Sequence, residues 1–266
     1  MAQSGDTRPL WAKLKMFVAD GRKIAGPDAA LHFGHADGAI VVAIGLNETC
    51  ATHPVLEEVL SAHGGAMKAG SQGVAPLIAG TAESGVFLYP VDCVVLAAEW
   101  LKTLQEDASK GEPLAALELI EGVATILEQV AETKLPVSHG GLSPWRICIT
   151  KEGAVSLVGY GIPALDMFAY LDEVSDELDI ESVRYAPTER LGCYEEDQKA
   201  DIYTLGVFAA QVMSGKQMFL GDFDAVYDAV GGGKSIEAVE HCAESLSDEL
   251  FELLAEHLRL FLELKH

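Results

Sequence analysis

The sequence predicts an α+β fold, with strands concentrated in its first third and helices in the remainder. Two patterns carry this prediction. In the first third, short apolar segments alternate with turn-forming residues, and from Val94 onward apolar residues recur at the three- and four-residue spacing of helices. The chain has 266 residues, 49% of them hydrophobic, which is enough for a sizeable core. No Pro/Gly/Ser-rich linker divides it, so we expect a single domain.

Two apolar segments, at 31–35 and 39–46, predict a β-hairpin. They are joined through Asp37-Gly38, a dipeptide that readily adopts the positive φ angles of a tight turn. Apolar spacing and flanking turn residues predict three more elements before residue 92. These elements are a helix at 54–63 and strands at 74–80 and 86–91.

The rest of the chain shows a helical period. One apolar face between Leu96 and Leu104 predicts a helix, and apolar positions from 114 to 131 predict a second, longer one. The elements expected next are a small hairpin at 147–150 and 155–158, a helix from Asp201 to Gly215, and a helix at 247–264. The middle helix is apolar on almost every face and ends at a glycine, which predicts that it is buried. Asp201 is expected to cap its N-terminus.

The composition excludes several classes of function. Lys and Arg number 18 against 41 Asp and Glu, so the formal net charge is −23, which argues against nucleic acid as the main partner. No apolar run reaches the roughly 18 residues of a spanning helix, so membrane insertion is not expected. Residues 1–20 lack the apolar segment of a secretory signal, so we expect a cytoplasmic protein. The five cysteines and eight histidines show no metal-ligand spacing, so we expect reduced thiols and no metal.

Four short segments carry patterns that bear on function. They are 139–146 (HGGLSPWR), 159–161 (GYG), 184–189 (RYAPTE) and 201–206 (DIYTLG). In order and spacing they resemble landmarks of protein kinases, bacterial Ser/Thr kinases in particular: the catalytic loop H-R-D-L-x-x-x-N, the D-F-G turn, the A-P-E motif and the start of the central helix. Gly141 and Gly159 are 18 positions apart, and Glu189 and Asp201 are 12 apart, which resembles the family's spacing.

The resemblance covers roughly 28–260 and is strongest at 113–221. It implies a two-lobed protein-kinase-like fold, in which a small β-rich N-lobe precedes a larger, mainly helical C-lobe. The boundaries that it suggests are an N-terminal extension at 1–27, the N-lobe at 28–91 and the C-lobe at 92–266.

The same resemblance implies that the chemistry has been lost. Phosphoryl transfer in this family needs a catalytic Asp, an Asn and the D-F-G Asp for magnesium, and a strand Lys for the phosphates. The positions that match these four are Gly141, Arg146, Gly159 and Gly45, the last of them in Val42-Ala43-Ile44-Gly45. A Gly-rich phosphate loop is also missing from the sequence. We therefore expect a pseudokinase that is not an enzyme, with neither ATP binding nor magnesium.

Four other matching residues are typical of the family's scaffold rather than of its chemistry. They are His139, Leu142, Glu189 and Asp201, which the resemblance assigns to bracing the catalytic loop, the end of the activation segment and the central helix. They are expected to be structural relics.

A kinase-like domain without catalytic groups suggests a scaffold or an allosteric regulator that binds another protein, either a basic one or a further domain of the same chain. The candidate partner-binding residues are Asp172, Glu173, Asp176 and Glu177 in an acidic segment, and Phe219 and Phe223, which could equally belong to the core. The alternative is a residual or metal-independent nucleotide-binding domain with weak or unorthodox transferase activity, in which Arg146 neutralises a phosphate. A third possibility, a small-molecule kinase, explains Gly140 but fails at Gly141.

Overall fold

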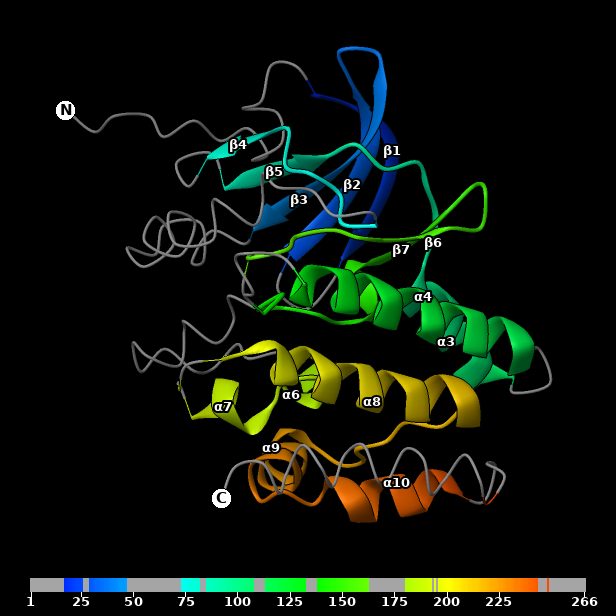
Figure 1. The fold of residues 1–266 in the computed structure, drawn as a ribbon, viewed down its shortest axis with the longest axis vertical. Coiled ribbons are helices and arrows are strands. Elements are labelled where there is room, and N and C mark those ends of the chain that lie inside the picture. Colours follow the sequence, from blue (N-terminus) through cyan, green and yellow to red (C-terminus); the bar gives the residue numbers. More distant parts are fainter. Residues whose placement is uncertain are drawn as a thin grey trace.

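A computed structural model shows a mixed α+β protein, with a five-stranded sheet at one end and most of the helices at the other (Figure 1). The structure describes residues 17–25, 29–46, 73–81, 85–107, 113–132, 138–162, 180–192, 194, 196–243 and 248. The predicted α+β class is therefore confirmed. The helix predicted at 54–63 lies outside the described residues, and so does the one predicted at 247–264 except for residue 248.

The larger sheet is antiparallel throughout and has the strand order β1-β2-β3-β5-β4. Its strands are β1 (Phe17–Ala25), β2 (Ala29–Ala36), β3 (Ala39–Leu46), β4 (Ala79–Thr81) and β5 (Val86–Tyr89). The predicted hairpin between β2 and β3 is confirmed, since Ala36 pairs with Ala39 across a turn. In that turn Asp37 and Gly38 have φ angles of 50° and 82°. Their ability to adopt positive φ determines where the chain reverses.

The sheet differs from the prediction at two places. It begins before residue 28, because β1 pairs with β2 and so belongs to the sheet rather than to an N-terminal extension. The strand expected at 74–80 is shorter, because only Ala79–Thr81 pairs with β5. Ile78 N still donates to Leu88 O of β5 at 3.0 Å, but the start of the predicted strand pairs elsewhere: Leu157 N donates to Gly73 O at 2.7 Å, and Ala75 N donates to Leu157 O at 2.9 Å. Those backbone groups are therefore not available to the five-stranded sheet.

A smaller antiparallel sheet has the order β6-β7-β8. It consists of β6 (Cys93–Leu96), β7 (Ile147–Thr150) and β8 (Val155–Leu157). The β7–β8 hairpin was predicted and is confirmed, whereas β6 was not predicted. The helical spacing that we read from Leu96 belongs to a helix that begins at Ala97. The four preceding residues form a strand because they pair with β7, a contact between distant parts of the chain.

The helices surround α8, which lies beside α4 (Figure 1). They are α3 (Ala97–Glu106), α4 (Pro113–Ala131), the 3-10 turn η3 (Pro144–Arg146), α6 (Ile180–Arg184), α7 (Thr188–Leu191), α8 (Gln198–Ser214), α9 (Phe223–Gly231) and α10 (Ser235–Ala243). Most of α8 is buried and Gly215 ends it at φ 67°, as predicted, although Ile202 has an exposed fraction of 41%. The predicted cap was wrong: the Asp197 side chain accepts the N–H of Lys199, and Asp201 lies inside the first turn. In the described part of the chain, no helix combines the length and apolarity needed to cross a bilayer.

The apolar core has a helical part and a part that joins the two sheets. The helical part lies around α4 and α8. The joining part brings Val42, Ile44 and Leu46 of β3 together with Cys148, Val158 and Ile162. Since neighbouring strand residues face opposite ways, Val41 and Ala43 belong to a separate cluster on the other face of the sheet.

Arg22 adds a polar link between the larger sheet and the helices. Its Nη2 lies 2.7 Å from Glu99 Oε2 of α3, and its Nη1 donates to the carbonyl of Cys93 at 3.0 Å. The guanidinium also stacks 4.0 Å from the centre of the Phe33 ring. One side chain of β1 thus contacts β2, β6 and α3.

Candidate functional site

The segment 138–162 lies where the two parts of the molecule meet, and it contains two of the four motif segments. Its first turn needs a glycine, because Gly140 has a φ of 77°. The N–H of Gly161 donates to His139 O at 2.9 Å, and the N–H of Ile162 donates to Gly159 O at 2.9 Å. These bonds bring the 139–146 loop and the 159–161 turn together.

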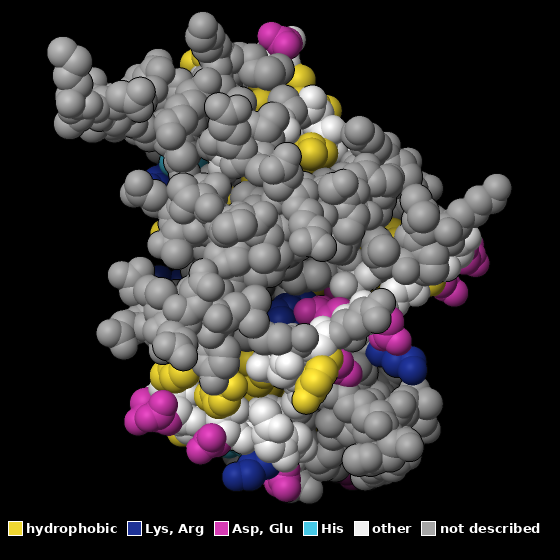
Figure 2. All heavy atoms as spheres, turned by 90° about the vertical axis from the view of Figure 1, so that its left-hand side faces the viewer, with side chains coloured by type: hydrophobic (Ala, Val, Ile, Leu, Met, Phe, Trp, Pro, Cys, Tyr) yellow, Lys and Arg dark blue, Asp and Glu magenta, His cyan; other side chains and the backbone are white. Residues whose placement is uncertain are grey.

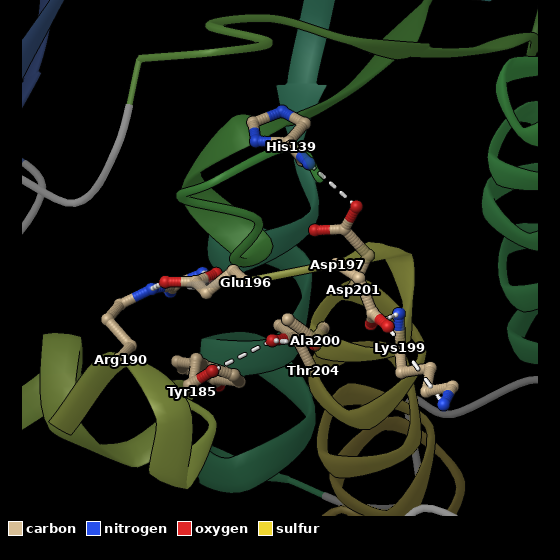
Figure 3. A network of polar contacts seen from close by, with 9 residues as sticks. All are labelled: His139, Tyr185, Arg190, Glu196, Asp197, Lys199, Ala200, Asp201 and Thr204. Atoms are coloured by element: carbon tan, nitrogen blue, oxygen red, sulfur yellow. Dashed lines mark hydrogen bonds and ion pairs between the residues drawn. The ribbon is translucent and has the colours of Figure 1, made fainter. Parts of the chain in front are cut away.

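Asp201 of α8 holds the start of this loop, as Figure 3 shows. Its Oδ2 accepts the backbone N–H of His139 at 2.7 Å. The His139 ring lies 3.2 Å from Val158 O through Nε2 and packs edge-on against Tyr160, with ring centres 5.1 Å apart. His139 and Asp201 are both buried, with exposed fractions of 0% and 1%. The carboxylate therefore connects the central helix to the loop without contact with solvent.

Burial also sets the protonation of this pair. It lowers the pKa of His139 well below the usual value, and the charges of Arg146 and Arg190 lower it further. The ring is therefore neutral, and its Nε2–H donates to Val158 O. Burial raises the pKa of Asp201 to about 7, although the His139 N–H and Arg190 oppose this shift. Asp201 thus changes its charge near neutral pH.

A largely buried ion pair between Arg190 and Glu196 stabilises the region around His139 and Asp201. Arg190 contacts Glu196 through Nε–Oε1 at 2.9 Å and Nη2–Oε2 at 2.8 Å, a bidentate geometry (Figure 3). Thr204 Oγ1 donates to Tyr185 O at 2.8 Å. These contacts fix the segment before α8 and the residues around Tyr185 against the central helix.

The guanidinium of Arg146 occupies the centre of the site. Arg146 has the largest side chain among the fully buried ones, with an exposed fraction of 0%. Its Nη1 donates to Gly159 O at 3.4 Å. A Cβ atom on Gly159 would lie 2.0 Å from Nη1 and 3.0 Å from Ile44 Cδ1, and the φ of Gly159 is 77°. A side chain at position 159 therefore requires the Arg146 guanidinium to move from its present place.

Gly45 does not belong to this cluster. A Cβ added there would lie 3.7 Å from Ala30 O and 3.9 Å from His32 Cδ2, both ordinary contacts. Its neighbour Ile44 is the β3 residue that approaches Gly159. The motif match aligns position 45 with the strand lysine of kinases, but a side chain there would lie beside Ala30 and His32, on the face of β3 opposite to Ile44. Because successive strand residues face opposite sides of a sheet, the sequence could have indicated that positions 44 and 45 face different ways.

The structure locates most of the other predicted site residues. Gly141 is buried in the loop, and Leu142 packs into the helical core. Glu189 is half-buried and close to Tyr203, whose pKa burial raises to about 12, with a further rise from the Glu189 charge. Asp172, Glu173, Asp176 and Glu177 lie outside the described residues.

The two aromatic candidates differ in exposure. Phe219 has an exposed fraction of 2% and packs in the helical core, so it is not available to a partner. This corrects its prediction as a partner-binding residue; the core alternative holds because its side chain belongs to the same buried cluster as Val226 and Val230 of α9. Phe223 is half-buried and stacks on Tyr227, with ring centres 6.0 Å apart.

Sequence reasoning missed two contributors to the site. The Arg190–Glu196 pair gave no signal, because a separation of six residues has no periodic meaning outside a helix. Tyr89, at the end of β5, is also buried near Arg146. Burial raises the pKa of its phenol, and the Arg146 charge opposes that rise.

A pocket of about 510 Å³ lies beside this centre. It is formed by β1, α3, η3 and residues near α6, with Trp145 and Tyr185 among its apolar walls. Its polar groups include Glu99 and Lys102. The size is within the range of small-ligand sites.

The residues at the centre do not fit a divalent metal ion. A guanidinium fills the space beside Gly159, and neither Gly141 nor Gly159 has a side chain that could ligate. Across the described ranges, no group of three His, Cys, Asp or Glu side chains is placed to hold a metal. A scan against known protein families finds no match, and a search of curated proteins finds none either.

Proposed function

We propose that this chain is a catalytically inactive protein-kinase-like domain, a pseudokinase, that acts by binding another protein as a scaffold or regulator. One observation carries the proposal. The guanidinium of Arg146 is buried against Gly159, the residue that the sequence resemblance matches to the magnesium-binding Asp of kinases.

The kinase-like part of the proposal is supported by the arrangement of elements. A five-stranded antiparallel sheet, corresponding to an N-lobe, precedes a helical part built around a buried helix. The HGGL loop lies between them, and Asp201 of the central helix binds its backbone at His139. These features suit the bracing role that the family resemblance gives to both residues.

The proposed loss of catalytic activity is supported by the charge of Arg146. In kinases, carboxylate and amide oxygens hold the magnesium ions that neutralise the phosphates. Here a fixed positive charge occupies the corresponding place, and it would repel a divalent cation. Gly141 offers no carboxylate to orient a hydroxyl group. A protein with this centre retains a shaped surface, which is what protein binding requires.

A second candidate function rests on the pocket beside β1, α3 and η3. Its volume would accept a nucleotide or another small ligand, and Lys102 would offer a positive charge. Arg146 is fully buried, so this second function would rely on Lys102 rather than on Arg146. It corresponds to the metal-independent nucleotide binding that the sequence left as an alternative.

A phosphotransfer assay and thermal-shift titrations with ATP, ADP and GTP, with and without magnesium, test both candidates. The proposal predicts no phosphate transfer and no shift; a ligand at about 100 times its Kd would add about 2.7 kcal/mol of stability. Phosphate transfer would contradict the proposal. A magnesium-independent shift that Lys102→Ala abolishes would favour the second candidate.

A further inference from the structure

We infer that α9 and the turn before it form a docking surface for a basic, amphipathic helical segment of a partner protein. The α9 surface consists of Leu220, Phe223, Asp224, Tyr227 and Asp228. The inference rests on the proposed protein-binding function and adds the chemistry of the partner.

The apolar part of the α9 surface is presented by a tight turn. Leu220 has an exposed fraction of 59%. Gly221 follows it at φ 116°, and a Cβ there would lie 2.7 Å from Ala225 Cβ, so the turn needs this glycine. Phe223 and Tyr227 stack one helical turn apart, with an interplanar angle of 24°. Both rings pack partly against the helical core, which keeps them rigid.

The acidic part runs alongside the aromatic pair. Asp224 and Asp228 are exposed and four residues apart, so they lie on one side of α9. Within the described residues neither makes an ion pair. Asp222 differs from them, because its side chain caps the helix by accepting the N–H of Ala225 at 3.1 Å. No Lys or Arg occurs between residues 217 and 233.

Asp228 is electrostatically unfavourable while the surface is empty, whereas Asp224 lies in the first turn of α9, where the helix dipole favours a carboxylate. Two like charges at this spacing destabilise a helix, and Asp228 lies near the C-terminal end of α9, where the helix dipole is negative. A cation placed over the two carboxylates would relieve both effects. Figure 2 shows hydrophobic and acidic side chains next to each other on the lower part of the molecule, at the height of α9 in Figure 1.

The chemistry of the partner follows from this pattern. An amphipathic helix with Lys or Arg along one edge of its apolar stripe would place apolar side chains on Leu220 and Phe223 and cations on the carboxylates. The net charge of −23 would speed the encounter with such a segment. The same charge disfavours an acidic segment.

The test uses the full chain and a synthetic peptide of about four helical turns made of Lys and Leu at amphipathic spacing. A second peptide has Glu in place of Lys. Fluorescence anisotropy at low and at physiological ionic strength should show binding of the basic peptide alone, weaker at the higher ionic strength. Asp224→Lys/Asp228→Lys should weaken binding about tenfold or more, and Leu220→Ala should weaken it severalfold.

Matched controls lie on α4. Glu121→Lys/Glu128→Lys makes the same charge change at exposed positions, and Leu114→Ala removes an apolar side chain that is 69% exposed. Both should change the affinity less than about twofold. Equal losses in the α4 and α9 variants, or no binding of the basic peptide, would overturn the inference and leave the proposed function standing. Phosphate transfer by a chain that still binds through α9 would overturn the proposed function alone.

Discussion

Arg146 and Gly159 are matched in size and depend on each other. The glycine provides the space that the guanidinium fills, and the guanidinium donates to the glycine carbonyl. On the proposed kinase resemblance, Gly159 matches the position of a metal-binding carboxylate and Arg146 matches that of an amide. A side chain introduced at position 159 therefore has space only if the guanidinium moves.

We predict that Gly159→Ala lowers the free energy of unfolding by about 3 kcal/mol or more, measured by denaturant titration. The new Cβ adds a clash with Arg146 Nη1 to the strain of a positive φ. Gly153→Ala is the matched control, because Gly153 has a φ of 81° and nothing within 4 Å of its added Cβ. It should lose only about 1–2 kcal/mol. Equal losses in the two variants would contradict the steric account.

At the scale of elements, the bond between α8 and the 139–146 loop depends on a carboxyl group that titrates near neutral pH. Burial raises the pKa of Asp201 from 3.8 to about 7, so the folded protein holds this proton more tightly than the unfolded chain does. The stability that this proton provides is fully present below pH 3.8 and is lost as the pH rises through about 7.

Asp201→Asn should remove this dependence, because an amide oxygen still accepts the His139 N–H but does not titrate. We expect the stability of the native chain, relative to this variant, to fall by several kcal/mol as the pH rises from 4 to 7. Denaturant titrations at several pH values measure the difference. A difference that does not change with pH would show that Asp201 is already ionised throughout this range.

Elements with local signals were predictable from the sequence, and elements that depend on distant partners were not. Asp37-Gly38 marks its turn by conformational preference alone. Strand β6 exists because distant β7 pairs with it, so the short run before Ala97 looked like part of a helix. Asp201 was expected to cap α8 because it precedes an apolar run, whereas its partner is His139, 62 positions earlier. For the site, motif matching identified the residues of the 139–146 loop and the 159–161 turn. Which residues of β3 face these segments is determined by packing, which a motif does not encode.

At the scale of the whole molecule, Arg22 joins the five-stranded sheet to β6 and α3. Its contacts with Glu99, Cys93 and Phe33 are partly exposed, so each is worth little by itself. Together they hold β1 near the pocket that Glu99 helps to line.

We predict that Arg22→Ala lowers the free energy of unfolding by about 1 kcal/mol and that Arg22→Lys recovers only part of this loss. A lysine keeps the charge but lacks the fork that reaches both Glu99 and the Cys93 carbonyl. Lys199→Ala is the control, since Lys199 is exposed and lies 4.0 Å from Asp197. It should change stability by less than about 0.5 kcal/mol. A loss in Arg22→Ala no larger than in this control would show that the link is unimportant.

The central claim is that a buried guanidinium has replaced the metal site of a kinase-like domain. Calorimetric titration of the full chain with ATP, in the presence and in the absence of magnesium, tests it most directly. We expect no magnesium-dependent binding, because the Arg146 guanidinium fills the space beside Gly159 and neither Gly141 nor Gly159 has a side chain that could ligate the ion. Stoichiometric binding that requires magnesium would contradict this account.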